Sequence, residues 1–167
     1  MTAAEIILAA VTLQRASELV VSHYNTQRLM ARGAMEVAPR HYPLIVAVHA
    51  GWLISLWVFG RQQPVNIVFL TGYLVLQGFR FWMLWTLGAR WTTRIIVLPG
   101  QPLVSGGPYR FLPHPNYAVV AGEIAVLPLT LGLPLLAAVF TVLNAAVLAI
   151  RITAENRALA ASREKSA

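Results

Sequence analysis

The sequence predicts an all-α integral membrane protein with about five transmembrane helices, and three observations support this prediction. Of the 167 residues, 57% are hydrophobic and 11% are charged, and the mean hydropathy is +0.63. Long segments without charge recur along the chain, and basic residues gather at their ends. Because soluble domains carry about a quarter charged residues, this composition is typical of a membrane protein. We treat residues 1–167 as a single membrane-embedded domain.

Composition also excludes several classes of chemistry. The chain has no cysteine, which excludes disulfides and thiolate catalysis, and its four histidines are scattered without clustered carboxylates, so we expect no metal site. The net charge of +7 does not predict a nucleic-acid partner, because the arginines flank apolar segments instead of forming a stripe with interleaved aromatic residues.

The first predicted span, about residues 4–26, carries Arg15, Glu18, Ser22 and Asn25 at steps of three, four and three. This spacing places all four on one helical face. Since a charged side chain at mid-membrane costs at least ~2.5 kcal/mol, that face must point into a helical bundle. Two interpretations stay open at this point: an Arg15–Glu18 pair that locks helix packing, and a polar lining for a substrate cavity.

The second span, about 42–60, contains no charged residue and is long enough to cross ~30 Å of hydrocarbon. The third, about 65–87, is interrupted by Arg80, which lies within two turns of its end. We expect Arg80 to snorkel to the membrane interface. The aromatic belt expected beside it consists of Trp82, Trp85 and Trp91.

The apolar stretch from residue 111 to residue 150 is too long for one crossing. A turn at residues 131–134, Leu-Gly-Leu-Pro, divides it into two short spans, about 118–131 and 134–151. Glu123, its one charge, is expected near the membrane surface. After the last span, a polar C-terminal helix is predicted over residues 151–165.

The distribution of basic residues predicts the topology. With the N-terminus outside, ten arginines and lysines fall on one side of the five spans and Arg61 alone on the other. The positive-inside rule then places the loop over residues 88–117 and the C-terminal helix in the cytosol. The ten are Arg28, Arg32, Arg40, Arg90, Arg94, Arg110, Arg151, Arg157, Arg163 and Lys165.

The loop is the best candidate for a functional site. Its glycines and prolines exclude a regular helix between residues 100 and 108, and Pro113 and Pro115 bracket His114. Pro115 favours the first turn of a helix, so His114 would lie at a helix N-terminus, where anions bind readily.

The C-terminal helix can complete this site from the same compartment. Arg151 and Glu155 share one helical face and can close over the loop, or they form a solvated pair of small effect. Tyr109 and Tyr117 are either site residues or interfacial aromatics. These residues indicate a cytosol-facing pocket for a polar cofactor and an apolar substrate, without fixing the reaction.

Two motifs resemble the isoprenylcysteine carboxyl methyltransferase family of membrane enzymes. They are Gly-Pro-Tyr-Arg-x-x-x-His-Pro-x-Tyr at 107–117 and Arg-Ile-x-x-Glu-x-x-Ala-Leu at 151–159. The stretches 91–100, 32–36 and 41–43 are similar to the bacterial branch associated with type III polyketide synthases. This resemblance implies a multi-pass protein of the bacterial plasma membrane.

The resemblance further implies an S-adenosylmethionine-dependent O-methyltransferase whose substrate enters from the bilayer. Arg151 would face this substrate and act as the catalytic residue. Carried over by position, the residues that bind the cofactor would be Gln101, Pro102, Leu103, Val104, Tyr109, His114, Pro115, Asn116, Tyr117 and Glu155.

Two positions depart from the family pattern. Pro113 stands where the family usually has arginine, and Asn156 stands where it has a second acid. Arg94 and Arg110 are the candidates to replace the missing cation.

The acceptor predicted from the resemblance is an alkylpyrone-like polyketide hydroxyl or, as runner-up, a prenylcysteine-like carboxylate. The alternative functions are an NADPH-dependent membrane reductase with a similar C-terminal half and a non-enzymatic membrane scaffold.

Overall fold

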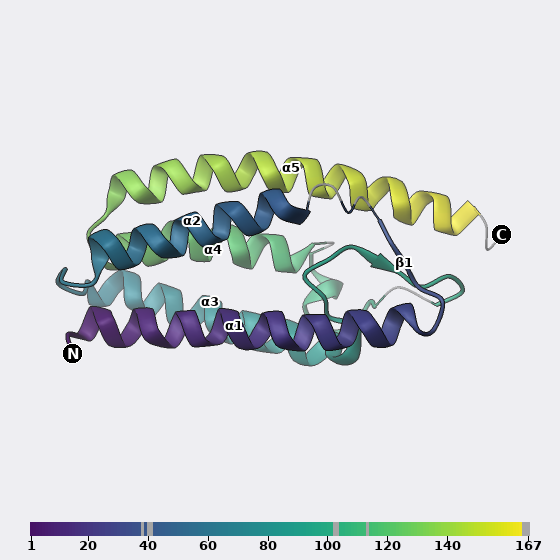
Figure 1. Ribbon diagram of the computed structural model, residues 1–167, viewed down its shortest axis with the longest axis horizontal. Helices are drawn as coiled ribbons and strands as arrows, with labels where there is room; N and C mark the ends of the chain where they lie inside the picture. Colours follow the sequence, from purple (N-terminus) through teal and green to yellow (C-terminus); the bar gives the residue numbers. More distant parts are fainter. Residues whose placement is uncertain (38, 40–41, 102–103, 113, 165–167) are drawn as a thin grey trace.

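The computed structural model describes residues 1–37, 39, 42–101, 104–112 and 114–164, the last ten by their backbone alone. Five helices run along the long axis of the molecule (Figure 1), which confirms the predicted all-helical class. They are α1 (Ala3–Met30), α2 (Tyr42–Gly60), α3 (Ile67–Leu87), α4 (Pro115–Thr130) and α5 (Pro134–Glu164). Short strands β1 (Met35–Glu36) and β2 (Ile96–Val97) pair in an antiparallel ribbon.

Local sequence explains where the helices begin and end. Thr2 and Glu5 form a capping box at the start of α1, with the Thr2 hydroxyl accepting from the Glu5 amide at 3.1 Å. The Asn66 side chain caps α3 by accepting from the Val68 amide at 3.0 Å. The predicted turn between α4 and α5 is confirmed, with Gly132 at a φ of +64°. As predicted, α5 continues unbroken past Arg151.

The two ends of the bundle differ in content (Figure 1). The N-terminus lies at the same end as the α2–α3 and α4–α5 connections, where Thr2 Oγ1 donates to the Arg61 carbonyl at 2.7 Å and the Asn66 amide donates to the Thr130 carbonyl at 2.8 Å. The opposite end holds the ribbon, the loop between α3 and α4, and the end of α5. The loop and the C-terminal helix are therefore together, as predicted.

Within the part of the chain that the structure describes, three helical segments are long and apolar enough to cross a membrane: α2, residues 67–90 including α3, and α5 from Pro134 to Ala154. Helix α4 has 16 residues and is largely buried. Its Ile124 and Leu127 form the core together with Leu8 of α1 and Leu56 of α2. This arrangement makes α4 an interior helix that the other helices surround.

Candidate active site

The loop after α3 turns towards the protein interior directly after the helix ends. It begins with a 3₁₀ turn, η2 (Gly88–Arg90), and Trp91 follows at 3% exposure. The Trp91 carbonyl accepts a hydrogen bond from Asn25 Nδ2 of α1 at 2.8 Å. The prediction that Trp91 belongs to an aromatic belt is therefore wrong, because the chain turns inward beyond η2. Trp85, at 89% exposure, fits the belt.

Thr93 connects three helices at the centre of the loop. Its amide donates to Ser22 Oγ of α1 at 2.8 Å, and its hydroxyl lies 2.8 Å from the same oxygen. The hydroxyl is also 3.1 Å from the Tyr42 hydroxyl of α2. Its carbonyl accepts from Arg151 Nη2 of α5 at 2.9 Å. Thr93 is therefore held from one side by α1 and α2 and itself contacts Arg151.

Arg151 joins the loop to the start of α4. Its side chain is buried, and its guanidinium carbon lies 5.7 Å from the centre of the Tyr117 ring. The Tyr117 ring in turn stacks on His114, with ring centres 5.4 Å apart and planes inclined by 26°. Three residues predicted for the site, His114, Tyr117 and Arg151, are thus brought together at one end of the bundle.

Arg151 keeps one buried donor. Among the described residues, its Nε has no hydrogen-bond partner. Since buried donors are normally paired, this nitrogen could serve a ligand with an acceptor oxygen.

The other predicted site residues follow the same segment. Pro115 is confirmed as the first residue of α4, and Asn116 beside it is half-buried. Tyr109 lies in a second 3₁₀ turn, η3 (Gly107–Arg110). Gln101 and Val104 lie half-buried between β2 and η3. Pro102, Leu103 and Pro113 lie outside the described residues, as does the side chain of Glu155, so their roles stay predictions.

Of the two candidates to replace the missing cation, Arg94 is already engaged. Its Nη1 donates to both carboxylate oxygens of Glu36, at 2.8 and 2.9 Å. Its guanidinium also lies 4.4 Å from the centre of the Tyr42 ring. Arg94 therefore fastens the ribbon to α2, whereas Arg110 is exposed at the end of η3.

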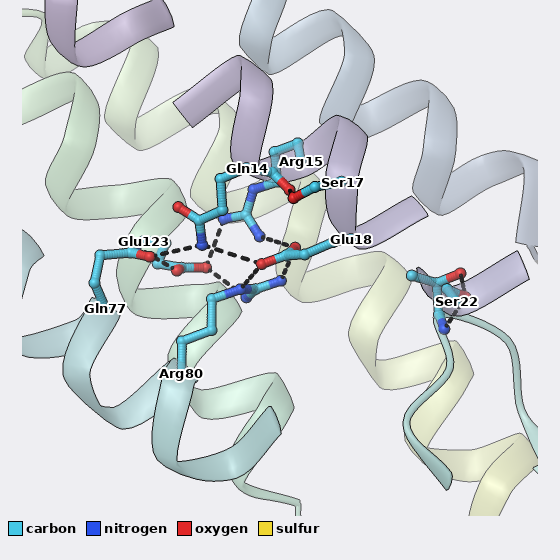
Figure 2. A network of polar contacts seen from close by, with 9 residues as sticks. Gln14, Arg15, Ser17, Glu18, Ser22, Gln77, Arg80 and Glu123 are labelled. Atoms are coloured by element: carbon cyan, nitrogen blue, oxygen red, sulfur yellow. Dashed lines mark hydrogen bonds and ion pairs between the residues drawn. The ribbon is translucent and has the colours of Figure 1, made fainter. Parts of the chain in front are cut away.

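A cluster of four charged side chains lies inside the bundle on the side of α1 (Figure 2). Arg80 donates through Nε and Nη2 to the Glu18 carboxylate and through Nη1 to Glu123 Oε2 at 3.0 Å. Arg15 contacts the same two carboxylates, at 3.1 Å to Glu18 and 2.8 Å to Glu123. Two guanidinium groups thus face two carboxylates. We call Arg15, Glu18, Arg80 and Glu123 the charge cluster.

The charge cluster overturns one expectation. Arg80 does not snorkel outward but is 4% exposed within the bundle. Glu123 is 1% exposed within the bundle, and its position near the membrane surface stays a prediction. Both side chains are buried because each finds its counter-ions inside, with further hydrogen bonds from Gln77 to Glu123 at 2.7 Å and from Gln14 to Glu18 at 3.0 Å. The contacts support the interpretation that the polar face of α1 locks helix packing.

Thr93 was not predicted as a site residue from the sequence. Nothing in its immediate context distinguishes it from Thr92. The available signal was indirect, since the helical spacing of Ser22 and Asn25 indicated that α1 contacts something polar beyond Glu18.

Gly107 offers a local test of the loop geometry. It has a φ of +56°, and a Cβ there would collide with Thr86 of α3. Gly107→Ala is therefore expected to lower the free energy of unfolding by about 1–3 kcal/mol. The backbone strain of an alanine at positive φ and the collision with Thr86 both destabilise the folded state. Thermal unfolding of the purified protein measures this loss.

The control is Gly106→Ala at the neighbouring position, where φ is −87° and no atom lies within 4 Å of the added Cβ. Equal melting temperatures for the two variants would contradict the described packing of η3 on α3.

Comparisons with known proteins cover most of the chain. The model of the family described as "Isoprenylcysteine carboxyl methyltransferase (ICMT) family" matches residues 67–161. The uncharacterized protein YpbQ of Bacillus subtilis (strain 168) is 38% identical, over 92% of this chain and 95% of its own. An uncharacterized protein of Haemophilus influenzae is 23% identical, over 92% and 93%. No solved structure matches the chain.

Proposed function

Because the chain belongs to the isoprenylcysteine carboxyl methyltransferase family, we propose that it is an S-adenosylmethionine-dependent methyltransferase acting on a carboxylate or hydroxyl oxygen of a lipophilic acceptor. The observation that carries this proposal is the meeting of His114, Tyr117 and Arg151, which come from both family motifs, at one end of the bundle. The matched region includes the loop and these three residues.

The residue types that the structure describes at this site suit S-adenosylmethionine. The stacked rings of His114 and Tyr117 offer an aromatic surface of the sort on which a purine packs. Tyr109 and the segments 101–104 and 114–117 are the residues that would hold it, together with Glu155.

Arg151 would bind the acceptor. When bound, S-adenosylmethionine would supply an electrophilic methyl group. The acceptor oxygen would attack the methyl carbon in line as the C–S bond breaks and S-adenosylhomocysteine leaves, so alignment accounts for much of the acceleration. The planar guanidinium suits an anionic oxygen, and its buried position strengthens the interaction. A carboxylate or an acidic enol is already ionised near neutrality, so Arg151 needs to orient it and no base must remove a proton.

Within the methyltransferase class, the acceptor we propose is an alkylpyrone-like polyketide hydroxyl, with a prenylcysteine-like carboxylate as the second candidate. The similarity of residues 91–100 to the polyketide-associated branch supports the first. Either acceptor has an apolar chain that would enter from the lipid.

The topology we propose has five spans in a bacterial plasma membrane, with the N-terminus outside. Helices α1 and α4 would complete the three candidate spans. Support comes from the common end of the loop and α5. It also comes from the ten basic residues that the positive-inside rule assigns to that side.

Calorimetric titration of the purified protein with S-adenosylhomocysteine tests the cofactor assignment. We expect saturable binding and a higher melting temperature, since a ligand at 100 times its Kd stabilises by about 2.7 kcal/mol. The control titrant is NADPH, which the methyltransferase should ignore. Binding of NADPH alone would indicate the alternative function, a membrane reductase. If neither ligand binds and the melting temperature is unchanged, the non-enzymatic membrane scaffold is the remaining alternative.

A further inference from the structure

The polar face of α1 extends beyond the charge cluster to the candidate active site. Ser22 lies one helical turn past Glu18 and points to the loop, as Figure 2 shows beside the cluster. Ser22 is 2% exposed and Asn25 is 5% exposed. Both residues precede the family-matched region, which begins at residue 67.

The bonds of these two residues are with the backbone and hydroxyl groups of the loop. Ser22 Oγ accepts from the Thr93 amide at 2.8 Å, and Asn25 Nδ2 donates to the Trp91 carbonyl at 2.8 Å. Two consecutive turns of α1 therefore hold the segment 91–93. Because α1 is anchored to α3 and α4 through the charge cluster, this segment rests on a rigid element.

The same segment contacts the residue proposed to bind the acceptor. The Thr93 carbonyl accepts from Arg151 Nη2 at 2.9 Å, while the Thr93 amide is bound to Ser22. A guanidinium is planar, so a fixed acceptor at Nη2 restricts how the whole group can rotate. The position of Ser22 thus influences the direction in which the remaining Arg151 donors point.

We propose that Ser22 and Asn25 are positioning residues of the acceptor site: Ser22 holds Thr93 and Asn25 holds Trp91, so that the Thr93 carbonyl orients Arg151. This inference rests on the proposed function. It assigns to α1, outside the matched region, a part in methyl transfer that differs from locking the helices.

Ser22→Ala tests the proposal, with Ser17→Ala as the matched control. Ser17 lies on the same helix, but its hydroxyl donates to the Gln14 carbonyl within α1 and is exposed. We expect Ser22→Ala to lower the kcat for methylation of a long-chain alkylpyrone or an S-farnesylated cysteine about tenfold, since misplacement near 1 Å costs up to about 10²-fold. The Kd for S-adenosylhomocysteine should stay within about twofold. Equal kcat values for the two variants would overturn the proposal.

Two measurements decide the positioning without any turnover. Hydrogen exchange should show a faster Thr93 amide in Ser22→Ala than in Ser17→Ala, because that amide loses its acceptor. The Nε resonance of Arg151, identified by its absence in Arg151→Lys, should shift in Ser22→Ala alone.

Unchanged exchange and an unchanged Arg151 resonance would overturn the proposal whatever the kinetics. If the wild type binds no S-adenosylhomocysteine, the proposed function fails, and these two signals still determine whether Ser22 orients Arg151.

Discussion

Arg80→Ala is expected to lower the free energy of unfolding by about 3–5 kcal/mol, because it leaves two buried carboxylates with one cation. Arg80 contacts Glu18 and Glu123, which are 8% and 1% exposed. The bonds from Arg15 and Gln77 cannot compensate for the second positive charge. Thermal unfolding in detergent and the yield of folded protein from membranes measure the effect.

Arg94→Ala provides the comparison within the same chain. The Arg94–Glu36 pair has similar distances, but the Arg94 side chain is 39% exposed. Water replaces the lost partner there, so we expect a loss of about 0–1 kcal/mol. A loss of this small size for Arg80→Ala as well would contradict the buried charge cluster.

The double variant Arg80→Met, Glu18→Gln separates charge from packing. It removes one charge of each sign and keeps the Arg15–Glu123 pair at 2.8 Å. Because apolar replacement of a balanced buried pair is often close to neutral, we expect the double variant to unfold at a higher temperature than Arg80→Met alone, which has the same side chain at position 80 but leaves the Glu18 charge in place. An equal or lower temperature for the double variant would contradict unbalanced buried charge as the cause of the loss.

Arg151→Ala is expected to reduce kcat/KM by about 10²-fold or more while leaving the affinity for S-adenosylhomocysteine within about threefold. Truncating one partner of a buried charged hydrogen bond costs about 2–5 kcal/mol, and each 1.36 kcal/mol is a factor of ten in rate. Steady-state methylation with a long-chain alkylpyrone, combined with calorimetry, separates the two quantities.

Arg151→Lys is the matched variant, since it keeps the positive charge but not the planar fork. We expect it to recover only part of the lost rate. If the affinity for S-adenosylhomocysteine falls by the same factor as turnover, Arg151 binds the cofactor and not the acceptor.

Much of the fold could be predicted from the sequence because its determinants are local. The charge-free run after residue 41 predicted a helix that the structure places at Tyr42–Gly60. Residues 131–134 predicted the turn before α5, and Pro115 predicted the start of α4. Such signals act over a few neighbouring residues, so no tertiary information is needed to interpret them.

Part of the candidate site could be predicted as well. The two motifs identified His114, Tyr117 and Arg151, and the structure brings these three together. The spacing of Arg15, Glu18, Ser22 and Asn25 correctly predicted a polar face that points into the protein.

The partners of that face could not be predicted, because they lie far away in the chain. Arg80 is 62 residues from Glu18, Glu123 is 108 residues from Arg15, and Thr93 is 71 residues from Ser22. From sequence alone, a single arginine near the end of a helix is expected at the membrane interface. Its ion pair with a carboxylate on another helix is visible only in the tertiary structure. The sequence by itself determined the helices, their ends and the common side of loop and tail. Tertiary structure alone decided which buried charges pair and how α1 reaches Arg151, since ion pairs and hydrogen bonds depend on distances that packing sets.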